Sequence, residues 1–281
     1  MKLKSKKTPV SVMTSYKWEI IVGVAFLGSL ISVLWNILQP SDQVTRSLSD
    51  RKDPPTELIS AQSSQSRPVS EPSSAMSEEA LLEVLKKDPQ NPDAHLQLAN
   101  IYAIKGQLEP AIKEYQVVLR NNPALWEVHY NLGIAYYDFG KADEAVNHYH
   151  EALALRPSEA DIYLNLAVAY TTLGNLEDAT KAYQESLKLN PNNIAARNNL
   201  GNLYRRSGKL NLAIKEYEEA LKLSPQDVLT NYNVGVMLDI VGKKEEAIRY
   251  YDTMLKLASG KPQYQSYIKV AENRIMQLKK P

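Results

Sequence analysis

Asparagine recurs at one register of the chain and offers the clearest chemistry in the sequence. Four asparagines stand 34 residues apart, and a glutamine occupies the same register one interval earlier: Gln97, Asn131, Asn165, Asn199 and Asn233. Asparagine is a poor helix former, so its recurrence inside predicted helices indicates a role for its side chain. Because an amide both donates and accepts hydrogen bonds, this asparagine row can bind the backbone of an extended peptide without reading its sequence.

Residue types that support catalysis are sparse. The chain has no cysteine, which excludes disulfides, thiolate metal ligands and a cysteine nucleophile. His148 and His150 lie two residues apart on a predicted helix and point in different directions, whereas His95 and His129 share one register where packing is the better interpretation. The sequence contains no phosphate-binding glycine loop, nucleophile elbow or zinc-protease motif, and no basic patch interleaved with aromatic residues. We therefore expect no enzymatic activity, cofactor, metal site or nucleic-acid partner.

The elements that position the asparagine row repeat every 34 residues. Counting Trp126 as position 1, each unit has glycine at position 15, alanine at position 20 and tyrosine at position 24. In the unit that begins at Trp126, Tyr136 lies on a first amphipathic helix, Gly140 supplies the turn, and Tyr149 lies on a second helix. A proline at position 32 ends that second helix. Each pair of helices leaves an apolar face uncovered, so the units must stack.

This pattern resembles the tetratricopeptide repeat, with which it shares its spacing, its small residues at positions 8 and 20 and its terminal proline. The resemblance implies an all-α fold, with twelve helices in a right-handed superhelical solenoid. The repeats and their flanking elements are a half-repeat helix at 77–91, repeats at 92–125, 126–159, 160–193, 194–227 and 228–261, and a capping helix at 262–281. The chain departs from the family by having tyrosine instead of phenylalanine at position 24. Its fifth repeat is degraded, with Val234, Leu238 and Ser259.

The resemblance also implies a binding face. In this family the first helices of the repeats line a concave groove that receives a peptide or a helix of a partner protein, with positions 2, 5, 6, 9, 12 and 13 facing it. The predicted binding residues are Asn131, Asn165, Asn199, Asn233, Tyr130, Tyr137, Asn100, Asn202, Arg205 and Tyr232. The asparagine row is similar to the asparagine ladder of O-linked N-acetylglucosamine transferase. The alternative is that asparagine is simply common at this position of the repeat.

Charge along the predicted groove is uneven. Position 2 is acidic in the first three repeats, where it is Asp93, Glu127 and Asp161. The fourth repeat instead carries two cations, Arg205 and Arg206. Chaperone-binding members of the family clamp a C-terminal carboxylate with cations, but this chain has Leu96 and Asp161 at two of the cationic positions. The chaperone carboxylate clamp is therefore absent.

A basic head and an apolar run precede the repeats. The formal net charge is +1, yet residues 1–17 carry five lysines and no acid. From Ile20 to Ser41 no side chain is ionisable, and a helix of this length spans a bilayer core of roughly 30 Å. We therefore predict a transmembrane anchor at 18–38, with Trp18 and Trp35 near the two interfaces. The alternative is a cleaved signal peptide, whose apolar stretch would be only about 7–15 residues long.

The flanking charges predict the orientation of this anchor. The lysines place the N-terminus in the cytoplasm and the repeats on the opposite side, which is the periplasm in a bacterium. A domain facing the cytosol is the alternative, because Arg46, Arg51 and Lys52 follow the apolar run. Residues 39–76 contain ten serines and five prolines and are predicted to form a disordered linker.

Together these features predict a single-pass membrane adaptor or scaffold. It would bind proteins or extended peptides in its groove and help to assemble or stabilise a membrane-associated complex. The alternative is a permanent structural subunit or self-assembling scaffold that uses the ends or the convex face of the solenoid, without peptide recognition. The partners are proteins or peptides, and the sequence does not identify them.

Overall fold

The computed structural model describes residues 76–280, which lie within the second of two compact units of the chain, residues 53–281. The predicted basic head at 1–17, the anchor at 18–38 and all but the last residue of the linker at 39–76 lie outside the described residues. Between residues 76 and 280, no helix is both long enough and apolar enough to cross a membrane.

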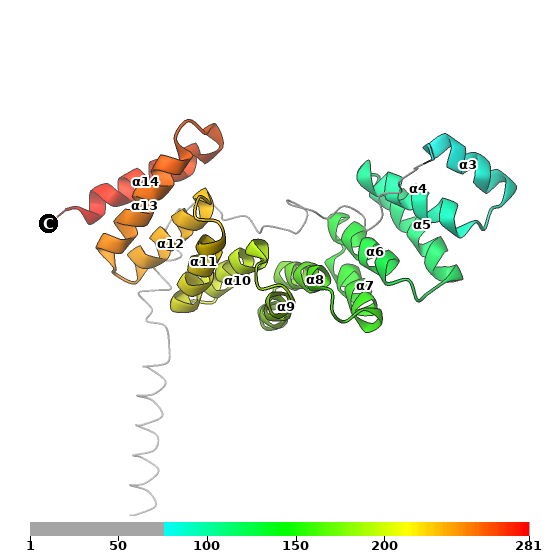
Figure 1. Cartoon of the computed structure of the whole chain (residues 1–281), viewed down its shortest axis with the longest axis horizontal. Helices are drawn as coiled ribbons and strands as arrows, with labels where there is room; N and C mark the ends of the chain where they lie inside the picture. The colour runs from blue at the N-terminus through cyan, green and yellow to red at the C-terminus, as the bar shows by residue number, and fades with distance from the viewer. Residues whose placement is uncertain (1–75, 281) are drawn as a thin grey trace, which may run out of the picture. The chain divides into compact units, whose positions relative to one another are not determined.

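Residues 76–280 form twelve α-helices and one short 3-10 helix, and contain no strand (Figure 1). Their bounds are α3 Glu78–Lys87, α4 Pro92–Ile104, α5 Leu108–Asn121, α6 Trp126–Asp138, α7 Ala142–Leu155, α8 Ala160–Leu173, α9 Leu176–Leu189, α10 Ile194–Arg206, α11 Leu210–Leu223, α12 Val228–Ile240, α13 Lys244–Ala258, η2 Pro262–Tyr264 and α14 Gln265–Leu278. The predicted all-helical solenoid with twelve helices is confirmed for this part of the chain.

Helices that follow one another in the chain pack together in pairs and then stack. We call the first helix of each repeat its A helix (α4, α6, α8, α10 and α12) and the second its B helix (α5, α7, α9, α11 and α13). The first four B helices also contact the A helix of the next repeat, and α13 contacts α14, so the apolar faces that one pair leaves open are covered by its neighbours.

The glycine at position 15 forms the turn between the A and B helices. Gly140 has a φ of 83° and Gly174 a φ of 80°, a backbone region in which residues with a side chain are strained. Around Gly140, its own N–H donates to the Tyr137 carbonyl and the Lys141 N–H donates to the Tyr136 carbonyl, both at 2.9 Å. These two bonds satisfy carbonyl groups that the end of α6 would otherwise leave unpaired.

The core of each repeat is built around its position-24 tyrosine. All five of these side chains are at most 1% exposed: Tyr115, Tyr149, Tyr183, Tyr217 and Tyr251. In repeats 2, 4 and 5, position 8 is glycine, and a Cβ atom placed there would lie 2.6–2.9 Å from the nearest atom of the tyrosine ring. The absence of a side chain at position 8 therefore sets how closely the A and B helices approach.

The last helix, α14, is held by a partly buried ion pair as well as by apolar packing. Ala271 and Ile275 are buried, as the sequence predicts for this helix. Arg274 on α14 donates from Nε and Nη2 to the two carboxylate oxygens of Asp239 on α12, at 2.8 and 2.9 Å. Because this geometry is bidentate, it fixes the direction of α14 against the fifth repeat.

The close contact at position 8 predicts that Gly133→Ala lowers the free energy of unfolding. Alanine is the better helix former by about 1 kcal/mol, but the added methyl group would meet Tyr149 Cε1 at 2.6 Å. Overpacking of this kind costs roughly 1–3 kcal/mol, so the net change should be destabilising in chemical denaturation.

Two control variants isolate the cause of this loss. Combining Gly133→Ala with Tyr149→Phe should not restore stability, because the close contact is with the edge of the ring and not with the hydroxyl group. Ala99→Gly in the first repeat should also destabilise the fold, by about 1 kcal/mol from helix propensity and about 0.8 kcal/mol from the lost burial of a methyl group. A Gly133→Ala protein as stable as the wild type would show that the ring shifts without cost.

Candidate functional site

The predicted binding residues all lie on A helices. Asn100 is on α4, Asn165 is on α8, and the others are on three further helices: Tyr130, Asn131 and Tyr137 on α6, Asn199, Asn202 and Arg205 on α10, and Tyr232 and Asn233 on α12. The four asparagines of the row are buried, with exposed fractions of at most 6%. Their side chains therefore contact neighbouring helices, and the structure shows what some of them bind.

Asparagines of the row interact with tyrosine hydroxyl groups of the preceding repeat. The Asn165 Nδ2 donates to Tyr130 Oη at 2.8 Å, which joins α8 to α6. Burial raises the pKa of Tyr115, and a hydrogen bond with Asn131 lowers it in part. The asparagine row thus connects successive repeats in addition to any role in binding.

In two repeats the asparagine at position 9 accepts a hydrogen bond from the tyrosine at position 24 of the same repeat. The Tyr115 hydroxyl donates to Asn100 Oδ1 at 2.6 Å, and the Tyr217 hydroxyl donates to Asn202 Oδ1 at 2.7 Å. These contacts explain how tyrosine can replace phenylalanine at position 24 in repeats 1 and 4, because a buried hydroxyl needs a partner. Sequence reasoning assigned Asn100 and Asn202 to the groove and missed this pairing. The sequence does contain a clue to this pairing, because position 9 is an asparagine in repeats 1 and 4 and an apolar residue in the other three repeats.

The other predicted residues differ in how much of their surface is accessible. Tyr137 is half-buried, and its hydroxyl lies 3.0 Å from Thr172 Oγ1 of the next A helix. Tyr232 is buried and packs edge-on against Tyr267, with ring centroids 5.1 Å apart. Arg205 is half-buried beside Tyr217, whose pKa is raised by burial and lowered in part by the charge of Arg205. Tyr137 and Arg205 are therefore the most accessible residues of the predicted set.

Acidic charge at the first residues of the A helices is partly desolvated. Asp161 is exposed at its residue surface, yet burial of its carboxyl group raises its pKa, and Glu159 raises it further. The same charge acts on Tyr130, whose pKa is raised first by burial and then by Asp161. Burial thus disfavours the charged form of Asp161, and a cationic group beside it would favour that form again.

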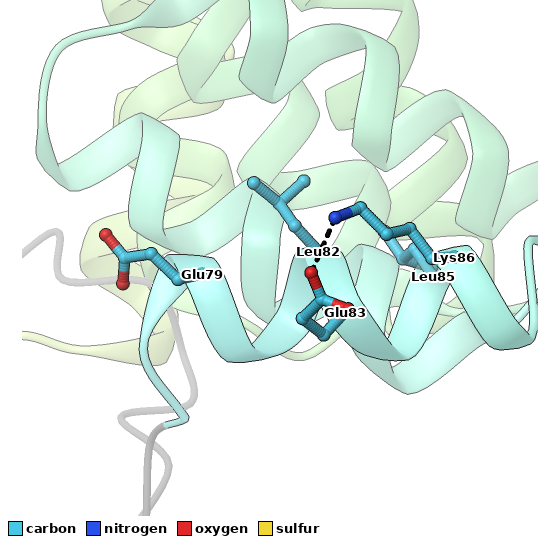
Figure 2. A pocket seen from close by; sticks show the side chains of 5 residues that line it. All are labelled: Glu79, Leu82, Glu83, Leu85 and Lys86. Carbon is cyan, nitrogen blue, oxygen red and sulfur yellow. Dashed lines mark hydrogen bonds and ion pairs between the residues drawn. The ribbon is translucent and has the colours of Figure 1, made fainter.

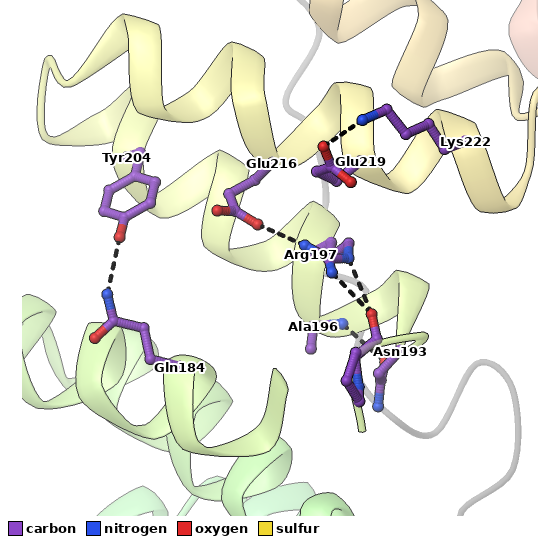
Figure 3. A network of polar contacts seen from close by, with 9 residues as sticks. Gln184, Asn193, Ala196, Arg197, Tyr204, Glu216, Glu219 and Lys222 are labelled. Atoms are coloured by element: carbon purple, nitrogen blue, oxygen red, sulfur yellow. Dashed lines mark hydrogen bonds and ion pairs between the residues drawn. The ribbon is translucent and has the colours of Figure 1, made fainter. Parts of the chain in front are cut away.

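A second set of polar contacts links position 4 to the preceding proline. His95 Nε2 and His129 Nε2 lie 3.1 and 3.0 Å from the carbonyl oxygens of Pro89 and Pro123. Arg197 makes the equivalent contact in the fourth repeat and also pairs with Glu216 at 3.1 Å (Figure 3). The histidines at position 4 are buried, as expected, and are hydrogen-bonded as well.

A third set of contacts joins position 25 of one repeat to the tyrosine at position 11 of the next. Gln116 donates to Tyr136 Oη at 2.7 Å, and Gln184 donates to Tyr204 Oη at 3.2 Å (Figure 3). His150 makes the same contact with Tyr170. The series cannot continue into the fifth repeat, where position 11 is leucine.

An open cavity of about 520 Å³ lies along α3, which precedes the asparagine row in the sequence (Figure 2). Its lining comprises Glu79, Leu82, Glu83, Leu85 and Lys86, and none of these belongs to the predicted binding residues. Leu82 is 40% exposed, because α3 is a B-type helix for which residues 76–280 supply no A helix. Across the same described range, no group of three or more histidine, aspartate or glutamate side chains is arranged to hold a metal ion.

Paired helices that recur every 34 residues, each pair packed against the next, define a helical-repeat protein with a solenoid fold. Sequence models identify the repeat: a tetratricopeptide-repeat model matches residues 130–194, a TPR-repeat model matches 99–140 and 201–238, and a further tetratricopeptide-repeat model matches 80–113 and 182–215. Together they span residues 80–238, more than half of the chain. The chain belongs to the tetratricopeptide-repeat family and is a scaffold of the protein-binding type.

Solved structures share this fold. A crystal structure of MamA is 26% identical, with a TM-score of 0.57, and the match covers 59% of this chain and 98% of that one. YrrB, described as a TPR protein with an unusual peptide-binding site, is 20% identical, with a TM-score of 0.59 and coverage of 70% and 100%. MamA from Desulfovibrio magneticus RS-1 is 18% identical, with a TM-score of 0.58 and coverage of 61% and 97%. No curated protein matches the chain.

The pairing of Asn202 with Tyr217 predicts a stability loss that a second substitution recovers. Asn202→Val places the residue found at this position in repeats 3 and 5 but removes the acceptor of a buried hydroxyl. The expected cost is about 1–3 kcal/mol in chemical denaturation. Adding Tyr217→Phe should recover most of it, with a coupling energy of about 1 kcal/mol in the double-mutant cycle. Strictly additive effects would contradict the pairing.

Proposed function

We propose that the protein is a membrane-anchored adaptor that binds an extended segment of a partner protein along its A helices. In doing so it helps to assemble or stabilise a membrane-associated complex. The asparagine row and the accessible side chains of Tyr137 and Arg205 form the proposed binding face.

The observation that carries this proposal is a pair of unused acceptors at position 6. Gln97 Oε1 and Asn131 Oδ1 are buried, and neither has a hydrogen-bond partner among the described residues. A buried acceptor without a partner costs roughly 1–3 kcal/mol. The two atoms occupy the same register of consecutive repeats. If the two amide side chains turn toward the groove, an extended chain could supply a backbone N–H to each oxygen and recover that cost.

The similarity to YrrB supports the proposal by analogy. That protein is described as having a peptide-binding site, and it shares the fold of this chain. At 20% identity the likeness concerns the fold, so the residues named here rest on their own contacts.

The alternative, a structural subunit that uses the ends of the solenoid, has one observation in its favour. The cavity on α3 and the exposed Leu82 leave an apolar surface at the start of the described stack. A partner that packs there would complete the first half-repeat and would not need the asparagine row.

Site-specific crosslinking separates these two functions. A photo-reactive amino acid at Tyr137 should capture a partner in the native membrane more efficiently than one at Lys113, whose side chain is 68% exposed on a B helix. Mass spectrometry should place the crosslinked residues of the partner in one continuous segment. Capture from Leu82 but not from Tyr137 would favour the structural alternative and contradict groove binding.

The anchor and its orientation are a further part of the proposal. The support for them is the run from Ile20 to Ser41 without an ionisable side chain, preceded by five lysines. We propose that residues 18–38 span the membrane with the N-terminus in the cytoplasm, which puts the repeats in the periplasm or an equivalent compartment.

Reporter fusions after residue 281 check this orientation. Alkaline phosphatase should be active and green fluorescent protein should be dark, because the first requires export and the second folds in the cytoplasm. The opposite pair of results would place the repeats in the cytosol. Release of both fusions from the membrane by cleavage near residue 40 would instead indicate a signal peptide.

A further inference from the structure

The side chains at positions 4 and 23 meet across the A and B helices of a repeat, and their chemistry differs between repeats. In repeat 1, His95 Nδ1 lies 2.5 Å from Glu114 Oε2. In repeat 4, Arg197 pairs with Glu216 at 3.1 Å. Repeat 2 departs from this pattern, because its position 23 is a histidine: His129 Nδ1 and His148 Nδ1 lie 3.2 Å apart. Two basic groups thus occupy the place where repeats 1 and 4 have a basic side chain paired with a glutamate.

The backbone fixes how the protons are arranged in this pair. His129 Nε2 lies 3.0 Å from the carbonyl oxygen of Pro123, which can only accept, so Nε2 carries the hydrogen. In the neutral ring, His129 Nδ1 is then an acceptor. The hydrogen bond between the two rings must therefore be donated by His148 Nδ1, which leaves His148 Nε2 as the free basic nitrogen.

The pair is enclosed by groups from three helices. Tyr136 of α6 stacks on the His148 ring, with centroids 5.4 Å apart and planes 5° apart, and Gln116 of α5 donates to the Tyr136 hydroxyl. Glu151 lies on the same helix as His148, less than one turn further on. Burial lowers the pKa of His148, the neighbouring His129 lowers it further, and Glu151 raises it. His129 itself is 8% exposed.

The hydrogen bond between the two imidazoles can be kept with one added proton but not with two. The first proton can bind to His148 Nε2 while the hydrogen bond between the rings is kept. A second proton must bind to His129 Nδ1, where it replaces the only acceptor and leaves two N–H groups facing each other. Two partly buried positive charges at this separation repel strongly, because little solvent lies between them.

We propose that the His129–His148 pair is a pH-sensitive joint between α6 and α7, which loosens when both imidazoles are protonated. The unfolded or opened hairpin binds two protons near the ordinary histidine pKa of about 6.5, whereas the closed hairpin binds its second proton only at lower pH. The open form therefore holds more protons in that range, and the closed form loses stability as the pH falls below about 6.5. Since α6 also carries Tyr130, Asn131 and Tyr137, opening the joint would disturb the proposed binding face.

Hydrogen exchange of the full-length protein tests the joint without any ligand. Protection factors corrected for the intrinsic effect of pH should fall by roughly tenfold in α6 and α7 between about pH 7.5 and about pH 5, because the open form binds the second proton in this range and the closed form does not. The helices α10 and α11, which carry the Arg197–Glu216 pair, serve as the internal control and should change much less.

Two substitutions exchange the residue at position 23 between repeats 1 and 2. His148→Glu copies the residue of repeats 1 and 4 and should abolish the acid-induced loss of protection in α6 and α7. Glu114→His copies repeat 2 and should create a similar loss in α4 and α5. An unchanged loss in His148→Glu, or an equal loss in α10 and α11 of the wild-type protein, would overturn the proposal.

A measurement on the wild-type protein keeps the proposal testable if a variant does not fold. The ring nitrogens of the four histidines can be titrated by nuclear magnetic resonance, and the His129–His148 pair should take up its second proton well below about pH 6.5. If both rings of the pair are fully protonated at the ordinary histidine pKa, the joint does not exist. None of these outcomes depends on whether the asparagine row binds a peptide.

Discussion

The contact between position 8 and the tyrosine at position 24 is the constraint on which the rest of the structure depends. Where position 8 is glycine, as at Gly133, even a methyl group would lie 2.6 Å from the ring of Tyr149. Helices this close bury the whole tyrosine, including its hydroxyl group, and a buried hydroxyl needs a hydrogen-bond partner. In repeats 1 and 4 the asparagine at position 9 is that partner, so these two polar side chains serve the packing of the core before they are candidates for binding.

The asparagine row has a structural role as well as a proposed binding role. Asn165 binds Tyr130 of the preceding repeat, so one amide group both holds neighbouring repeats together and lies on the proposed binding face. Such a residue cannot be changed without affecting both roles. Asn131 also interacts with a tyrosine of the preceding repeat, Tyr115, but its Oδ1 atom has no partner among the described residues. Within one register, a binding role is therefore better supported at the second repeat than at the third.

The 34-residue period was sufficient to predict the helices, their turns and the core, because those depend on the direction of each side chain around the helix. Gly140 and Tyr149 illustrate this: the structure has them at a turn with positive φ and in the core. The partners of the polar residues could not be predicted in the same way. Asn202 points toward the same side of its helix whether it binds a ligand or Tyr217, and only the distance to the hydroxyl, 2.7 Å, decides between them. The membrane anchor at 18–38 lies outside the described residues and stays a prediction.

Differences between repeats are more informative about function than the features that all of them share. The shared glycine, alanine and tyrosine make each repeat fold and stack, so they are required whatever the protein binds. Positions 4 and 23 lie in the same geometry each time, yet they hold a histidine–glutamate pair, a histidine pair and an arginine–glutamate pair in repeats 1, 2 and 4. Stacking does not require this variation, since each of the three pairs joins the A and B helices of its own repeat. A feature that packing leaves free to vary is where a repeat can acquire a property of its own. The second repeat is the place to look first, because it combines a histidine pair with an unused buried acceptor at Asn131.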